Sequence, residues 1–243
     1  MASFSTTATL AEPEISRDDH GTPPPFRNGG DDGRPGLPDY GKRLRRARLG
    51  LLVALTPILM LFVSFTSAYV VRQGLPTLDP RTNNLIRDWI PVALPRLLLL
   101  NTLVLLVSSL SMELARRQLH SQVALATSLP AAGDTLPSKM PWLGVTLVLG
   151  LAFLFGQWTA WQQLAANGFY VATTPSSSFV YLLTGTHAAH LLGGVLALLI
   201  AGIASLLHRS LKTRSIIVDV TAWYWHFMAA LWIYIFCLMK FVR

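Results

Sequence analysis

The stretch MPWLGVTLVLGLAFLFGQWTAWQQLAANGFYVATTPSSSFVYLLTGTHAAHLLGGVLALLIAGIASLLH, residues 140–208, contains no Asp, Glu, Lys or Arg. A membrane-spanning helix needs about 20 apolar residues, so this stretch is too long for one span. The segment ANGFYVATTPSSS at residues 166–178 interrupts it. We therefore predict two transmembrane helices here, at residues 142–164 and 179–207.

The rest of the chain adds three more apolar segments, at residues 49–71, 95–116 and 222–241. Of the 243 residues, 52% are hydrophobic and 13% are charged, whereas soluble domains carry about 25% charged residues. The predicted fold class is all-α, a polytopic integral membrane bundle of five transmembrane helices formed by residues 42–243. Residues 1–41 are rich in Pro, Gly and Asp, and we expect a disordered cytoplasmic tail there.

The basic residues lie in short clusters beside the apolar segments, as in KRLRRAR at residues 42–48. The formal charge of +8 could indicate nucleic-acid binding, but there are no basic stripes with interleaved aromatic residues, so we expect no nucleic-acid partner. With the N-terminus inside, the cytoplasmic flanks carry more Lys and Arg than the outer flanks. We therefore expect a cytoplasmic N-terminus and a C-terminus on the outer side.

Ionisable residues inside the predicted spans are few, and each is a candidate functional group. Glu113 precedes Arg116 and Arg117 at the i+3 and i+4 positions, which favours ion pairs on a helix surface. A proton-handling role for this single carboxylate is the alternative. One helical side holds several polar residues and predicts a helix–helix face; its members are Asn101, Thr102, Ser108, Ser109, Met112 and Glu113.

Two further features predict contacts between helices. Gln157 lies inside a span, where we expect its amide to bond to a neighbouring helix, with ligand contact as the alternative. A ridge of small residues recurs every four positions along the fourth span and would let another helix approach closely. This ridge consists of Gly185, Ala189, Gly193, Ala197 and Ala201.

The histidines His187, His190 and His226 raise the question of haem or metal ligation. His187 and His190 share one helix face, but a pair without a third nearby ligand makes a poor zinc or copper site. Counted from the cytoplasmic ends of their predicted spans, His226 lies about 12 residues nearer the cytoplasmic side than His190. That separation is about 18 Å along a helix, too far for one haem iron. We expect no catalytic, cofactor-binding or metal-binding residue, and assign the histidines to polar contacts.

The lone cysteine, Cys237, lies in an apolar run. One cysteine cannot form an internal disulfide or a cysteine-based metal site. We expect it to be a small buried apolar residue.

Three motifs, on successive predicted spans, resemble subunit III of the haem–copper oxidases, the family that includes cytochrome c and quinol oxidases. They are LNTLVLLVSSLSMELARRQL at 100–119, LLTGTHAAHLLGG at 182–194 and AWYWHFMAALWIYIF at 222–236. Thr184, Gly185, His187 and His190 match the family's TG-x-H-x-x-H pattern. Trp223, Tyr224, Trp225, His226 and Phe227 match its WYWHF pattern. The resemblance covers roughly residues 42–243 and is to the five-helix bacterial form.

The resemblance implies a non-catalytic subunit of a proton-translocating terminal oxidase in the respiratory chain of a bacterial plasma (inner) membrane. It implies that subunit I is the main partner and holds the haem and copper. Other oxidase subunits and structural phospholipids, held in a cleft, are further expected partners. Family members commonly carry carboxylates where this chain has Ile58, Ala160 and Ala229, which implies a mainly structural version of the subunit.

Within this interpretation, the polar candidates for assembly are Glu113, Gln157, His187, His190 and His226. A stand-alone membrane b-type cytochrome, or a quinone-binding redox protein using the same histidines, is the alternative from another class. An accessory subunit of a related oxidoreductase, such as nitric oxide reductase, is a third possibility.

Overall fold

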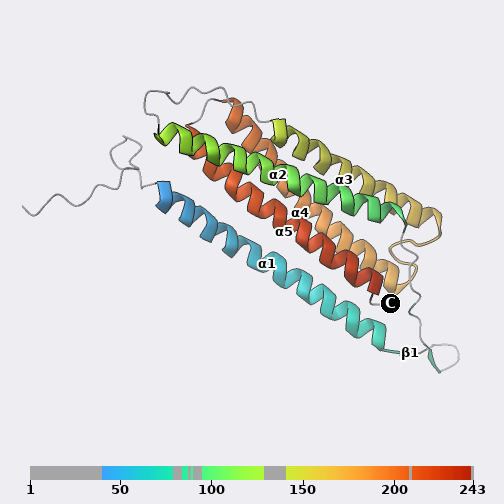
Figure 1. Cartoon of the computed structure of the whole chain (residues 1–243). Coiled ribbons are helices and arrows are strands. Elements are labelled where there is room, and N and C mark those ends of the chain that lie inside the picture. The colour runs from blue at the N-terminus through green and yellow to red at the C-terminus, as the bar shows by residue number, and fades with distance from the viewer. Residues whose placement is uncertain are drawn as a thin grey trace, which may run out of the picture. The chain divides into compact units, whose positions relative to one another are not determined.

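The computed structural model contains five long helices among its described residues (Figure 1). It describes residues 40–78, 84–86, 89, 95–128, 141–207 and 210–241, so the predicted tail lies almost entirely outside the described residues. The helices are α1 (Tyr40–Gly74), α2 (Leu97–Ser128), α3 (Pro141–Ala166), α4 (Pro175–Leu206) and α5 (Leu211–Phe241). Each is long and apolar enough to cross a membrane, which confirms the predicted five-helix bundle. The chain is a multi-pass membrane protein.

Four of the helices form a closed ring in which α2 packs on α3, α3 on α4, α4 on α5 and α5 back on α2 (Figure 1). Helix α5 is the most enclosed. In its most apolar 18-residue segment, 56% of the residues are buried, against 11% in the corresponding segment of α1. The outer faces of the ring are apolar, as a lipid-facing surface requires.

Helix α1 lies alongside this ring, and among the described residues none of its Cα atoms comes within 8 Å of a Cα atom in another helix. Its buried side chains, Leu55, Phe62 and Tyr69, are seven residues apart and so share one helix face. Long side chains make the contacts. The Tyr234 hydroxyl of α5 donates to Thr66 Oγ1 at 3.0 Å, so α1 is held by side chains rather than by close backbone packing.

The close packing within the ring depends on two glycines next to Trp225, whose side chain is fully buried. A Cβ atom on Gly150 of α3 would lie 2.7 Å from the Trp225 indole, and one on Gly194 of α4 would lie 3.1 Å from it. The absence of side chains at these positions lets the indole fit between α3 and α4. Its Nε1 donates to Ser108 Oγ of α2 at 3.2 Å.

Three helices begin four or more residues before their predicted spans. Helix α1 begins at Tyr40 rather than residue 49. Helix α4 begins at Pro175 rather than residue 179, because Thr174 and Ser177 form a reciprocal capping box with proline in the first turn. Helix α5 begins at Leu211, well before residue 222. The prediction followed apolar membrane-spanning segments, whereas the helix continues through the more polar residues that precede its span.

The connection after α1 contains a small hairpin that was not predicted. Strands β1 (Thr77–Leu78) and β2 (Leu85–Ile86) pair in antiparallel register. Beyond them, Trp89 packs its ring 5.0 Å from that of Tyr69 on α1. This aromatic contact ties the connection to the end of α1.

Candidate functional site

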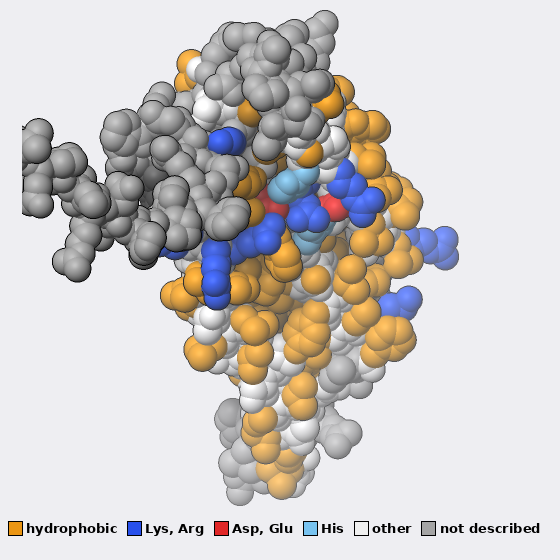
Figure 2. Space-filling view, turned by 60° about the vertical axis from the view of Figure 1, so that its left-hand side comes forward, with side chains coloured by type: hydrophobic (Ala, Val, Ile, Leu, Met, Phe, Trp, Pro, Cys, Tyr) orange, Lys and Arg blue, Asp and Glu red, His pale blue; other side chains and the backbone are white. Residues whose placement is uncertain are grey.

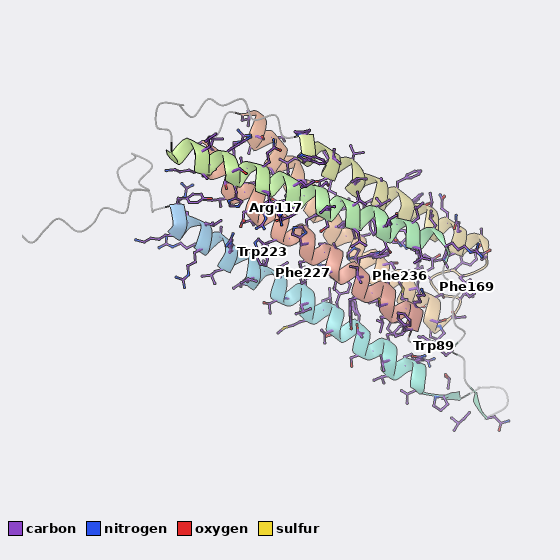
Figure 3. The ribbon with its side chains drawn as sticks, in the orientation of Figure 1. Trp89, Arg117, Phe169, Trp223, Phe227 and Phe236 are labelled. Atoms are coloured by element: carbon purple, nitrogen blue, oxygen red, sulfur yellow. The ribbon has the colours of Figure 1, made fainter. Side chains whose placement is uncertain are left out.

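The charged cluster, as we define it, joins three helices toward the end of the bundle where α1 begins. Its members are Arg48 on α1, Glu113, Arg116, Arg117 and His120 on α2, and Asp219 and His226 on α5. Figure 2 shows blue, red and pale blue side chains side by side on a face that is otherwise mostly orange. In Figure 3, Arg117 lies toward this end, whereas Trp89 and Phe169 lie toward the other.

Asp219 is the anchor of the charged cluster, because its side chain is completely buried. The guanidinium of Arg48 donates to both carboxylate oxygens, at 2.8 and 2.9 Å. Arg116 Nη1 donates to Asp219 Oδ1 at 3.2 Å, and His120 Nε2 lies 3.4 Å from the same oxygen. A buried carboxylate is tolerated only when it is paired in this way, so Asp219 joins α1, α2 and α5.

Glu113 forms the second half of the cluster and confirms the predicted pairing within α2. Arg116 donates to its two oxygens at 2.8 and 3.0 Å. Arg117 Nε donates to Glu113 Oε1 at 2.8 Å. Since Arg116 also bonds to Asp219, the two carboxylates belong to one continuous network.

His226 connects α5 to this network. Its Nδ1 lies 2.6 Å from Ser109 Oγ, and its Nε2 lies 3.5 Å from Glu113 Oε2. The structure therefore brings together two of the predicted polar residues, Glu113 and His226. The arrangement can hold paired charges and bind helices to one another.

His226 and His190 do not lie at the different depths predicted from the sequence. The prediction assumed a helix beginning at residue 222, but α5 begins at Leu211, which places His226 further along the helix. The Tyr224 hydroxyl donates to the His190 carbonyl at 2.8 Å, so the two histidines lie at similar levels in neighbouring antiparallel helices.

The two rings nevertheless have different surroundings. His190 Nδ1 donates to the Thr186 carbonyl of its own helix at 2.8 Å, and its ring lies 6.0 Å from that of Phe62 on α1. His226 contacts α2 instead. The contacts of the two imidazoles, rather than their depths, are what count against a shared iron.

His187 and Gln157 lie apart from the charged cluster, inside the ring of four helices. His187 is fully buried, and its ring lies 6.0 Å from that of Phe153 and 5.1 Å from that of Trp232. Gln157 is 2% exposed, and its Oε1 accepts no hydrogen bond from the described residues. Within the described part of the chain, the predicted bond to a neighbouring helix is therefore not made through this oxygen.

The ridge of small residues on α4 is partly uncovered in the single chain. Ala189 and Gly193 are exposed, whereas Ala201 is buried. Gly185 and Ala197 are intermediate. Its role in helix packing remains a prediction.

The helical face predicted on α2 faces the protein interior. Asn101, Ser108 and Met112 are buried, and Asn101 Nδ2 donates to the Phe153 carbonyl on α3 at 3.0 Å. The polar residues of α2 therefore hold the ring together.

Comparison with known proteins identifies the family of this chain. The family model described as "Cytochrome c oxidase subunit III" matches residues 44–242, which include almost all of the described chain. The chain belongs to the cytochrome c oxidase subunit III family. The resemblance carried by the three motifs is thereby confirmed.

Individual relatives are more distant. The chain is 29% identical over 102 residues to a probable cytochrome c oxidase subunit 3 of Mycobacterium leprae, covering 42% of this chain and 50% of that protein. It is 27% identical over 198 residues to the cytochrome c oxidase subunit 3 of Anopheles quadrimaculatus, covering 78% and 66%. The match thus spans about half the length of the bacterial relative.

In this subunit III family member, Asp219, the centre of the charged cluster, was not predicted from the sequence. Two signals were present. Asp219 is the only acidic residue after Asp134, and it precedes His226 by seven positions, which places both on one helix face. The residue was overlooked because it lies just before the predicted span at residues 222–241.

Proposed function

We propose that the protein is a non-catalytic subunit III of a haem–copper terminal oxidase in a bacterial plasma membrane. It would support the complex that reduces oxygen while translocating protons. The observation that carries the proposal is the family match over residues 44–242, and bacterial relatives support the membrane assigned.

The main partner would be the catalytic subunit I, which would hold the haem and copper. The exposed part of the small-residue ridge, Ala189 and Gly193, supports docking of a helix from such a partner, since small residues permit close approach. In the same proposal, membrane phospholipids cover the remaining apolar faces, and the basic start of α1 faces the cytoplasm.

The polar side chains described above support a structural role. Arg48, Asp219 and Glu113 are engaged in bonds between or along helices, and so is His226. The chain would therefore present to subunit I a surface whose helices are held together by these bonds, while the reaction takes place elsewhere in the complex.

The test is purification of the tagged full chain in mild detergent, with partner subunits identified by mass spectrometry and haem measured by absorbance. The proposal expects a haem-bearing catalytic subunit to co-purify. Recovery of the intact, folded chain without any haem-bearing partner would contradict it.

A further inference from the structure

His187 lies in the interior of the helical ring with both ring nitrogens unbonded to any described residue. Its side chain is fully buried between the rings of Phe153 on α3 and Trp232 on α5. A neutral imidazole carries one N–H donor and one bare nitrogen acceptor. Burying both without partners is costly, so the site calls for a polar partner.

The nearby polar groups are already engaged with other partners. Trp232 Nε1 donates to Thr102 Oγ1 at 3.0 Å. The Thr184 hydroxyl, one turn before His187, donates to the Val180 carbonyl at 2.6 Å and accepts from Trp161 Nε1 at 3.0 Å. These groups therefore do not supply the missing partner for His187.

Gln157 presents a second unbonded polar atom on the facing helix. It lies one turn from Phe153, whose ring contacts His187, and one turn from Trp161, which bonds to Thr184. This spacing places Gln157 on the side of α3 that faces α4, at the level of His187. Its buried Oε1 accepts no bond from the described residues.

We propose that the ring of helices binds buried water between His187 and Gln157. Water fits because it both donates and accepts: one molecule can accept from the imidazole N–H and donate to Gln157 Oε1. Buried waters typically make about three hydrogen bonds to otherwise unpaired groups. A metal is a poorer occupant, because the described residues hold no group of three or more His, Cys, Asp or Glu that could bind one.

The first test is proton-detected solid-state NMR of the full chain in lipid bilayers, with nitrogen-15 in His, Gln and Trp and magnetisation transferred from water. The proposal expects transfer to the His187 ring and a several-fold loss of it in Gln157→Leu. The buried Trp225 indole, which donates to Ser108, should receive none and serves as the internal control. Absence of transfer to His187 in the wild-type chain, or no loss in Gln157→Leu, would overturn the proposal.

The second test compares the thermal unfolding of His187→Phe, Gln157→Leu and the double variant. Each single change removes one polar partner of the water and leaves the other in place, whereas the double change removes both partners. We expect each single variant to unfold at a lower temperature, and the double variant to lose less than the sum of the two losses. Additive effects, or single variants that unfold at a higher temperature, would contradict a shared water. The wild-type NMR result decides the matter if a single variant fails to fold.

Discussion

The guanidinium of Arg48 on α1 donates two hydrogen bonds to the carboxylate of Asp219 on α5, at 2.8 and 2.9 Å. The carboxylate is completely buried, while the Arg48 side chain is 40% exposed. Because the described part of α1 makes no close backbone approach to the other helices, this pair is a main polar tie between α1 and the ring. Toward the other end of α1, Tyr69 makes edge-to-face contacts with Trp89 and Phe179.

Replacement of Asp219 by Asn should destabilise the protein by about 1–3 kcal/mol, because Arg48 and Arg116 lose a carboxylate partner. The exposed fraction of Arg48 keeps the loss below that of a fully buried pair. The free energy of unfolding of the purified full chain is the quantity to measure.

Arg48→Gln tests the same Arg48–Asp219 ion pair from the other side. Its effect should overlap with that of Asp219→Asn, so that the double variant loses less than the sum of the two single losses. Fully additive effects, or a wild-type stability for Asp219→Asn, would show that the pair does not hold α1.

Gly150→Ala should lower the stability by about 1–3 kcal/mol, since its new Cβ would lie 2.7 Å from the buried Trp225 ring. Gly144→Ala on the same helix is the control, because nothing lies within 4 Å of a Cβ there. Alanine favours a helix over glycine, so this control should be neutral or slightly stabilising. Equal thermal unfolding midpoints for the two variants would contradict the packing described around Trp225.

The number of helices could be predicted from the sequence because each span is a long apolar segment. The details of the site could not. Apolarity marks the part of a helix that meets lipid, so the polar start of α5 at Leu211 was missed, and with it the level of His226 and the role of Asp219. The pairing of Glu113 with Arg116 was predictable because it is local. The meeting of Glu113 with His226 depends on how α2 packs on α5, which residue spacing does not show.

His226→Phe should cost about 1–3 kcal/mol of stability, because a phenyl side chain cannot replace the contacts of the imidazole nitrogens with Ser109 and Glu113 on α2. His190→Phe should cost less, since among the described residues His190 Nδ1 bonds to its own helix, and a phenyl ring can keep the contact with Phe62. Chemical denaturation of both variants checks the order. A larger loss for His190→Phe would count against the charged cluster as the stronger tie.

Ala189→Phe, on the exposed part of the small-residue ridge, should reduce retention of the chain in the purified complex while leaving its own unfolding temperature unchanged. The bulky ring would block close approach of a partner helix. Val148→Phe, at an exposed position on α3, is the control. If both variants are retained as well as the wild-type chain, the ridge is not a docking surface.

The most direct test of the central claim, that this chain supports a haem-bearing complex without holding haem itself, is a pair of absorption spectra. The tagged chain is purified in mild detergent and its spectrum recorded, and a stronger detergent then separates it from its partners. We predict haem bands in the first preparation that stay with the partner fraction, and that persist in the complex of a His190→Ala variant. A Soret band that remains with the separated chain, and disappears in His190→Ala, would contradict the account.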